Sequence, residues 1–329
     1  MIPGDLPLVS VIIVSWNARA ELTNCLATLT PRACQYPMEI IVVDNASTDG
    51  SAELVEQRFP TVHLIRNEKN LGFARANNIG IKAASGEFLC LINSDVEVLD
   101  ECITKLVDFL RLNPDIGLVG PRILGRDGKV QRSCRGFPGV WNMFCRALAL
   151  DVVFPNSQIC GGYLMPYWPQ DTIRPVDILS GCFWLSRKEA LLETGLLDET
   201  FFMYGEDMDW CKRFRVRGWD VVFNPTAEAI HHGGASSANA PIEFFIEKQR
   251  ADLQYWRKHH GWLAQRCYFA ISCLHHLIRI FGHCCALWCG KKELQETHLK
   301  VARGYRCLRW LLSSNKHSRH DWEEKVCVG

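Results

Sequence analysis

The sequence predicts an α/β fold in which a mostly parallel sheet is flanked by helices, with a helical appendage at the C-terminal end. Apolar runs rich in β-branched residues alternate with helical patterns, at a repeat of about 30 residues that is typical of strand–helix–strand units. Polar clusters at Asn17, Asp44 and Asp95 follow three of these runs, as expected where buried parallel strands end. After residue 237 the alternation stops, and long amphipathic patterns take its place.

The first part of the chain carries the clearest patterns. The apolar run Leu8–Val14 predicts a buried strand, and the leucines that follow are spaced three and four residues apart, for one face of a helix. Ser47 and Asp49 can cap the next helix. Strands are expected at 38–43, 62–65 and 87–92, and helices at 47–59, 73–84 and 102–112. This alternation implies a doubly wound sheet with helices on both faces.

The remainder of the chain is less regular. Residues 121–169 are rich in Gly, Pro and aromatic side chains, which predicts an irregular excursion. Beyond it we expect a strand at 177–186, helices from 187 and at 205–217, strands at 219–223 and 228–231, an amphipathic helix at 242–259 and an apolar segment at 262–289.

Charge is unevenly distributed along the chain. The formal net charge is only +1, and 48% hydrophobic with 22% charged residues is ordinary for a globular enzyme. Residues 242–329, however, hold 15 Lys and Arg against 8 Asp and Glu, together with 8 of the 11 His. The rest of the chain holds 22 Lys and Arg against 28 Asp and Glu. An acidic body with a basic, apolar tail predicts that the tail meets an anionic surface such as a membrane.

The 16 cysteines are scattered without regular spacing, and no basic, apolar leader precedes them. This pattern favours reduced thiols in the cytoplasm over a disulfide framework. Three cysteines between residues 284 and 289 lie near three histidines, which raises the alternative of a zinc site. Two of these cysteines are adjacent, whereas structural zinc ligands are usually a few residues apart. Apolar thiols on a helix face are therefore the favoured interpretation.

Five segments together point to one family. They are VSVIIVSWN (9–17), VVDNASTDGS (42–51), NLGFARANNIG (70–80), LINSD (91–95) and LDETFFMYGEDMDW (197–210). In this order they resemble family 2 glycosyltransferases of the GT-A fold, a Rossmann-like arrangement, and notably their rhamnosyltransferase-like bacterial branch. The resemblance implies a catalytic domain at 1–236, with a nucleotide-sugar half at about 1–120 and an acceptor half at about 121–236. Residues 237–329 would form the amphipathic helical C-terminal segment.

The predicted donor site lies beyond the carboxyl ends of the strands, where such sheets bind ligands. The resemblance implies that Asp44 accepts a hydrogen bond from the pyrimidine ring of the donor. Gly72 permits close backbone approach, free amides at the following helix start suit a diphosphate, and Arg75 can add charge-assisted contacts. The predicted donor-binding residues are Asn17, Asp44, Asn45, Gly72, Arg75, Asn78, Asn93, Ser94 and Asp95.

Several of these residues also have a structural interpretation. Asp44 can form a turn, since Asp and Asn both favour that role. Arg75 can be an ordinary exposed helix residue. Asn78, like Asn70 and Asn77, can satisfy local backbone groups.

Residues 93–95 (Asn-Ser-Asp) occupy the position of the family's Asp-x-Asp motif. The resemblance implies that this motif holds Mg²⁺ or Mn²⁺ against the donor diphosphate, because hard cations prefer oxygen ligands. Asn replaces the first acid here, so Asp95 is the expected ligand and Glu97 is a reserve. GT-A enzymes often contribute a late histidine to the metal or diphosphate, and His231 is expected to do so. Alternatively, His231 and the adjacent histidine merely end a strand.

Three carboxylates gather at one helix start, at Glu206, Asp207 and Asp209. Helical spacing turns Asp207 inward, and a desolvated carboxylate that stays ionised can act as general base for an acceptor hydroxyl. The resemblance points to the same motif as the one that bears the base. Glu206 and Asp209, which is spaced to pair with Arg213, better fit charge complementation of the helix N-terminus. With Trp184 they are assigned to acceptor-side or supporting roles.

The resulting prediction is an inverting glycosyltransferase. The resemblance implies a dTDP- or UDP-linked donor, with dTDP-rhamnose as the leading sugar nucleotide, and a glycan or polyprenol-linked acceptor. The apolar but charge-interrupted tail predicts in-plane association with the cytoplasmic face of a membrane in preference to a span. A core-packing helical domain is the alternative for the tail, and no nucleic acid is expected as a partner.

Two other functions remain open at this point. A non-catalytic nucleotide-sugar-binding subunit of a polysaccharide assembly complex is supported by Asn93, whereas the Glu206–Asp207 pair argues against it. A nucleotidyltransferase would need a basic, Gly-rich loop after the first strand, and Ser15–Ala18 does not resemble one. No Gly-x-Gly-x-x-Gly follows that strand, which argues against a dinucleotide enzyme.

Overall fold

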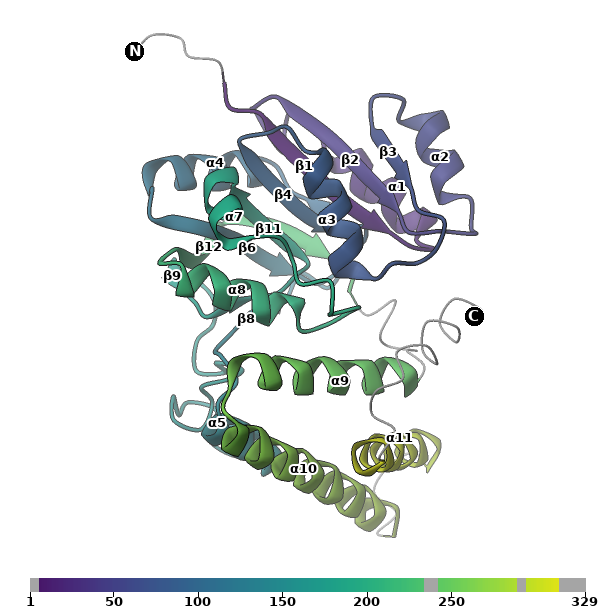
Figure 1. The fold of residues 1–329 in the computed structure, drawn as a ribbon, viewed down its shortest axis with the longest axis vertical. Coiled ribbons are helices and arrows are strands. Elements are labelled where there is room, and N and C mark those ends of the chain that lie inside the picture. Colours follow the sequence, from purple (N-terminus) through teal and green to yellow (C-terminus); the bar gives the residue numbers. More distant parts are fainter. Residues whose placement is uncertain (1–5, 234–241, 289–293, 314–329) are drawn as a thin grey trace. The chain divides into compact units, whose positions relative to one another are not determined.

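A computed structural model gives the fold of the chain (Figure 1). It describes residues 6–233, 242–288 and 294–313. These residues divide into two compact units, of which the first consists of 6–137 and 168–233 and the second of all the others. Residues 138–167, assigned from the sequence to the acceptor half, belong to the second unit because they contain helix α5 (Val140–Ala147), which packs on α10 (Trp262–Trp288).

A ten-stranded sheet forms the centre of the first unit, and its main path runs β3-β2-β1-β4-β11-β6-β12-β5. Strands β3, β2, β1 and β4 are parallel neighbours, as are β6 and β12, whereas β11 runs against both β4 and β6. This mostly parallel sheet confirms the predicted fold class. The strands are β1 (Val9–Ser15), β2 (Met38–Asp44), β3 (His63–Arg66), β4 (Phe88–Asn93), β5 (Val96–Val98), β6 (Ile116–Leu124), β7 (Val130–Gln131), β8 (Cys134–Arg135), β9 (Arg174–Pro175), β10 (Ile178–Leu179), β11 (Phe183–Arg187) and β12 (Asp220–His231).

Helices cover both faces of this sheet (Figure 1), as the strand–helix alternation predicted. They are α1 (Arg19–Thr28), α2 (Ser51–Arg58), α3 (Phe73–Ala83), α4 (Cys102–Leu112), α7 (Lys188–Thr194) and α8 (Glu206–Val216). Apolar side chains of α1, α2 and α4 join the odd-numbered residues of β1 in one buried cluster. On the opposite face α3 packs against Ile41 and Val43 of β2. There the ring of Trp184 also contacts those of Phe73 and Trp210, with centroids 6.5 and 5.1 Å away.

The strand predicted at 177–186 is two strands in the structure. They are β10 and β11, separated by a turn that contains Gly181. A Cβ atom at Gly181 would lie only 3.2 Å from the ring of Trp184. The turn lets β10 leave the main sheet and pair with β8 in a separate two-stranded sheet.

The two strands predicted at 219–223 and 228–231 are instead one long strand, β12. Its register against β6 shifts between Asn224 and Glu228. Pro225 lies in this interval and has no N–H to donate to the ladder, so the strand bulges there without ending.

The N-cap residue of α2 is Gly50, so neither Ser47 nor Asp49 is the cap that the sequence predicted, although Asp49 contacts the first turn. Asp49 Oδ1 accepts a hydrogen bond from the Ser51 N–H at 3.0 Å, but Ser47 Oγ accepts one from the backbone of Asn17. Helix α2 therefore begins at Ser51, later than predicted, after Gly50 in the left-handed conformation (φ +80°). The prediction for Ser47 was wrong because its hydroxyl joins two loops.

Five helices form the second unit. They are α5, α6 (Leu150–Val153), α9 (Ile242–His259), α10 and α11 (Leu294–Leu312). Helix α10 packs against α5, α9 and α11, and the rings of Trp256 and Tyr268 stack 4.5 Å apart between α9 and α10. Helix α11 lies in the segment predicted to be helical, although the sequence analysis gave it no bounds. Helix α10 is long and apolar enough to cross a membrane by length and composition, with a mean hydropathy of 1.3 in its best window.

Candidate active site

The topology of the sheet brings four strand ends to one edge. Strands β1, β2 and β4 are parallel, and β12 shares their direction because β6, its parallel neighbour, lies two antiparallel steps from β4. Their last residues are Ser15, Asp44, Asn93 and His231. The polar clusters predicted at the carboxyl ends of the strands therefore lie along the same edge, where open α/β sheets bind ligands.

Asp95 and His231, the two predicted metal ligands, are close together in the structure. His231 Nε2 lies 3.3 Å from Asp95 Oδ1, and both side chains are 18% exposed. Gln131 donates from Nε2 to the His231 carbonyl at 3.0 Å, so its Oε1 faces His231 Nδ1 at 2.9 Å. His231 then donates from Nδ1, as metal-binding histidines commonly do from the nitrogen that does not bind the metal. Its Nε2 lone pair faces the Asp95 carboxylate, and a cation or proton between them would relieve the repulsion.

His232 is occupied by other partners. Its Nε2 lies 2.6 Å from Glu97 Oε1, and its Nδ1 accepts a hydrogen bond from Arg126 Nε. Because Nδ1 accepts, Nε2 carries the proton and donates to Glu97. Glu97, the reserve metal ligand of the sequence analysis, therefore holds His232. The backbone N–H of His232 also donates to the Asp95 carbonyl at 2.9 Å, which fixes the two segments together.

The donor set at Asp95 and His231 fits a cation shared with a ligand. Within 6–233, 242–288 and 294–313, no group of three or more His, Cys, Asp or Glu side chains could hold a metal ion. This finding also covers the described cysteines and histidines of α10, while Cys289 lies outside the described residues. Mg²⁺ and Mn²⁺ sites of nucleotide enzymes commonly use one or two protein ligands plus phosphate oxygens and waters. Asp95 and His231 match that arrangement.

Asp44 has an unsatisfied oxygen. Its side chain is buried, with the residue 4% exposed, and Oδ2 accepts from the Ser47 N–H at 3.1 Å. Oδ1 has no hydrogen-bond partner among the residues that the structure describes, and neither has the buried Ser15 Oγ, which is in register with Asp44 on β1. Buried polar atoms are rarely left unpaired, so this pair suits a ligand with N–H or O–H groups. Sequence reasoning missed Ser15 because strand register is not visible in the chain.

Asn17 and Asn45 organise the loops beside this pair. Asn17 is exposed, and its Oδ1 accepts from the Thr48 N–H at 2.8 Å, which joins the loops after β1 and β2. Asn45 is buried and donates from Nδ2 to Asn70 Oδ1 at 2.7 Å, while its Oδ1 accepts from the Leu71 N–H at 2.9 Å. Both residues shape the edge of the sheet through contacts within the chain.

The backbone at Gly72 makes a close approach to Phe202, a residue of the same chain. A Cβ atom there would lie 2.4 Å from the Phe202 carbonyl oxygen, and Gly72 has a φ of +80° that disfavours other residues. The Phe73 N–H donates to the same carbonyl at 2.7 Å, and the Gly72 N–H donates to Asn70 Oδ1 at 2.9 Å. These two amides, expected to be free for a diphosphate, are satisfied internally.

Arg75 and Asn78 contact the segment before α8. Asn78 is 1% exposed, donates from Nδ2 to the Leu197 carbonyl at 2.8 Å and accepts the Leu197 N–H at 3.0 Å. It therefore satisfies backbone groups, which was the structural alternative. Arg75 is 56% exposed and lies 3.7 Å from a Glu199 carboxylate oxygen, so its guanidinium is accessible.

Asp207, the predicted general base, is paired with an arginine. Its side chain is 12% exposed, and Oδ2 accepts a hydrogen bond from Arg135 while Oδ1 accepts the Met208 N–H at 2.8 Å. Arg135 is held on β8, which pairs with β10 through Cys134 and Leu179. The sequence analysis missed Arg135 because it lies in the segment that carried no periodic pattern.

The other predicted acceptor-side residues lie in the protein interior. Asp209 is fully buried and binds Arg213 Nε at 2.8 Å, as its spacing predicted, and Arg213 in turn donates to the Thr194 carbonyl. Trp184 is also fully buried and donates to the Leu179 carbonyl at 3.2 Å, so it presents no surface to an acceptor. Glu206 is buried as well, with 6% exposed. Asp209 and Trp184 support α8 and do not form a substrate surface.

The carboxylates of Asp95 and Asp207 both raise the pKa of one buried thiol, that of Cys182. Burial raises the pKa of the Cys182 thiol to about 12, and the nearby carboxylates of Asp95 and Asp207 add to the rise. The Cys182 carbonyl also accepts the Asn93 N–H at 3.0 Å, next to the Asp95 segment. Asn93, two residues before Asp95, is therefore tied to the turn that contains Cys182.

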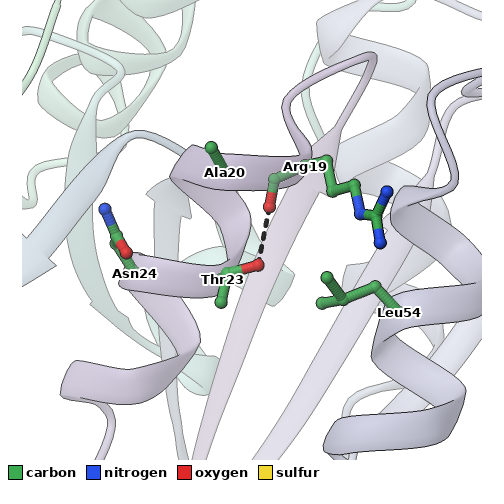
Figure 2. Close-up of a pocket in the computed structure, with 5 residues that line it drawn as sticks. All are labelled: Arg19, Ala20, Thr23, Asn24 and Leu54. Atoms are coloured by element: carbon green, nitrogen blue, oxygen red, sulfur yellow. Dashed lines mark hydrogen bonds between the residues drawn. The ribbon is translucent and has the colours of Figure 1, made fainter.

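A pocket of about 330 Å³ lies apart from these residues, between α1 and α2 (Figure 2). Its lining residues are Arg19, Ala20, Thr23, Asn24 and Leu54. The hydroxyl of Thr23 donates to the Arg19 carbonyl within α1, and the Arg19 N–H donates to Asp49. None of the predicted site residues lines this pocket, so we leave it out of the active site.

Comparison with known proteins identifies the family. Residues 10–170 match the Glycosyl transferase family 2 model. An N-acetylglucosaminyl-diphospho-decaprenol L-rhamnosyltransferase of Mycobacterium tuberculosis is 30% identical over 280 residues, covering 77% of this chain and 85% of the relative. This chain belongs to glycosyltransferase family 2. A hexosyltransferase of low-salt glycan biosynthesis in Haloferax volcanii is 26% identical over 229 residues, covering 68% of this chain and 66% of that protein.

Solved structures of glycosyltransferases share the fold of this family 2 enzyme. A mannosyltransferase of Pyrobaculum calidifontis, solved with GDP-Man and Mn²⁺, aligns with a TM-score of 0.55 over 94% of this chain and 89% of that one, at 16% identity. This likeness confirms the predicted GT-A fold. Membership of glycosyltransferase family 2 confirms the predicted enzyme class.

Proposed function

We propose that this glycosyltransferase moves a sugar from a nucleotide-diphosphate donor to a hydroxyl of a lipid-linked glycan in cell-surface polysaccharide synthesis, with inversion at the anomeric carbon. The pairing of Asp95 with His231 at the carboxyl edge of the sheet carries the proposal. These residues are 136 positions apart in the chain, and the fold brings them to 3.3 Å. The mycobacterial relative, whose name specifies a diphospho-decaprenol acceptor and rhamnose, supports a polyprenol-linked acceptor and a dTDP-rhamnose donor.

The donor would lie along the strand ends. The unpaired Asp44 Oδ1 and Ser15 Oγ suit the polar edge of a pyrimidine base. Asp95 and His231 would hold Mg²⁺ or Mn²⁺ against the diphosphate, where the cation would stabilise the charge of the leaving group. The exposed Arg75 guanidinium can add a further phosphate contact.

Asp207 would serve as the general base. It accepts the proton of the acceptor hydroxyl while that oxygen forms a bond to the anomeric carbon. The bond from that carbon to the diphosphate oxygen breaks at the same time, and the nucleotide diphosphate leaves. Arg135 donates a hydrogen bond to Asp207 Oδ2 and so orients the carboxylate. To accept the acceptor proton, Asp207 must give up part of this hydrogen bonding.

A lipid-linked acceptor lies in a membrane, so the enzyme needs a surface that contacts the membrane. Helix α10 has such a surface. Eight of its exposed residues recur every three or four positions, at Leu263, Arg266, Ala270, Leu274, Leu277, Phe281, Cys284 and Trp288. Seven of these eight are uncharged, and α10 contains no Asp or Glu. An apolar stripe that contains Arg266 and lies next to Arg279 favours a helix that lies in the plane of an anionic leaflet, which we place on the cytoplasmic side.

A second candidate is a donor-binding subunit without catalysis. Two observations favour it. Asn93 replaces the first acidic residue of the metal motif, and Arg135 forms an ion pair with Asp207, the predicted base. Such a protein would be stabilised by a nucleotide diphosphate and would show no sugar transfer.

A transfer assay separates the two candidates. Purified protein receives a panel of labelled nucleotide sugars, Mn²⁺ and a polyprenyl-diphosphate-linked acceptor. We expect product from at least one donor, and Asp207→Asn should lower kcat by about 10²–10⁴-fold, the usual contribution of a general base. Asp220→Asn, which alters an exposed ion pair with Arg215, is the matched control and should transfer normally. Binding of donor without any product would favour the subunit, and equal rates for Asp207→Asn would remove Asp207 from the mechanism.

A further inference from the structure

We propose that residues 138–167 insert into an anionic lipid bilayer beside α10, so that two elements far apart in the chain form one membrane-binding face. We call these residues the insert. The inference extends the membrane contact proposed for α10 and rests on it.

The insert carries almost no charge. Among its 30 residues only Arg146 and Asp151 are charged, whereas about a quarter of the residues in an average globular protein are. These two pair with each other, with Arg146 Nη1 3.5 Å from Asp151 Oδ2, and the Asp151 side chain is only 7% exposed. The outer surface of the insert is therefore nearly neutral.

Large apolar side chains of the insert are nevertheless exposed. Val152, Val153 and Phe154 are three consecutive ones, with 71%, 63% and 53% exposed. Trp141 and Ile159 add 55% and 71%, and the Trp141 indole donates to the Ile159 carbonyl at 3.2 Å, which ties the start of α5 to the loop after α6. Single exposed apolar residues are common, but a group of them marks an interaction surface.

The insert and α10 belong to the same packed unit. Helix α5 packs on α10, and α6 packs on α5. The exposed stripe of α10 is apolar in the same way as the insert. The fold of the second unit therefore couples the two apolar surfaces, although more than 90 residues separate them in the chain.

The charges and aromatic residues of this face fit lipid. Arg266 and Arg279 are exposed on α10, where they can meet lipid phosphates. Trp262 and Trp288 are 67% and 92% exposed at the two ends of α10, and Trp favours the boundary between headgroups and acyl chains. Trp141 adds a third exposed indole, on the insert.

Vesicle flotation tests the inference. The full-length protein is mixed with vesicles of phosphatidylglycerol and phosphatidylethanolamine, and the bound fraction is measured. We expect Val153→Asp with Phe154→Asp in the insert, and Leu277→Asp with Phe281→Asp in α10, each to weaken binding by about tenfold or more, because each places two charges in the apolar boundary. Leu192→Asp with Val216→Asp in the first unit, at sites 71% and 75% exposed, is the matched control and should bind like the wild type.

Three results would overturn the inference. One is wild-type protein that stays off the vesicles. Another is an insert variant that binds as well as the wild type while the α10 variant does not. The third is an insert variant that turns a dimer into a monomer by light scattering with unchanged vesicle binding, which would assign the face to a second copy of the chain.

The glycosyl-transfer proposal is tested separately. Transfer to a water-soluble acceptor analogue should be equal for the insert variant and the wild type, because Val153 and Phe154 are not among the residues proposed to hold the donor, the cation or the acceptor proton. Vesicle binding without any transfer would refute the proposed function and leave the membrane inference intact.

Discussion

In the first unit six large apolar side chains are exposed, whereas the second unit, with fewer described residues, exposes seventeen. The first unit buries its apolar residues on both faces of a sheet and leaves a few polar groups at one edge. The second unit keeps an apolar surface on α10 and on the insert. The difference indicates that the first unit uses its apolar side chains for its own core, while the second unit leaves many of them accessible.

The largest expected difference between the two units is in the free energy of unfolding after mutation of a tryptophan. Trp184 is fully buried in the first unit, and Trp288 is 92% exposed in the second. Trp184→Ala should lower the free energy of unfolding by about 3–5 kcal/mol, the usual cost of removing a buried aromatic side chain. Trp288→Ala should leave it nearly unchanged. Denaturant unfolding measures both, and equal losses would show that the two units do not differ in this way.

Removing the contacts between Asn78 on α3 and the loop at Leu197 should lower the free energy of unfolding by a smaller amount. Asn78→Ala removes a side chain that both donates to and accepts from the backbone of Leu197. Leaving those buried groups unpaired should cost about 1–3 kcal/mol of stability. Asn24→Ala, on the exposed side of α1, is the control. A loss for Asn24→Ala as large as that for Asn78→Ala would contradict the structural role of Asn78.

Cysteine thiols in the two units should differ in reactivity, and this difference can be measured on the wild-type protein. Burial raises the pKa of Cys182 to about 12, so its thiol is protonated at pH 8, and the same burial keeps reagents away from it. Cys284 is exposed on the stripe of α10. Mass-spectrometric mapping after maleimide treatment at pH 8 should find Cys284 modified and Cys182 unmodified. Vesicles should protect Cys284, and its full labelling on vesicles would argue against the membrane contact of α10.

The sequence predicted the parallel strands and their helices because burial on both faces leaves long apolar runs, such as that of β1. It also predicted the Asp95–His231 pair, through the family resemblance and the rule that parallel strands end at one edge. It could not show that Phe202 covers Gly72, that Asn78 binds Leu197 or that Arg135 binds Asp207. These contacts join segments far apart in the chain, and no local pattern records them. The insert was missed because its short helices pack on α10, and that packing is tertiary.

The central claim is that Asp95 and His231 share a divalent cation with the donor diphosphate. Electron paramagnetic resonance of free Mn²⁺, titrated with protein and UDP or dTDP, tests it most directly. We expect protein and nucleotide together to remove the free Mn²⁺ signal, with affinity at least about tenfold weaker in Asp95→Ala and His231→Ala. His232→Ala, at the neighbouring histidine held by Glu97, should bind Mn²⁺ like the wild type. Equal Mn²⁺ affinity in His231→Ala and wild-type protein would contradict the claim.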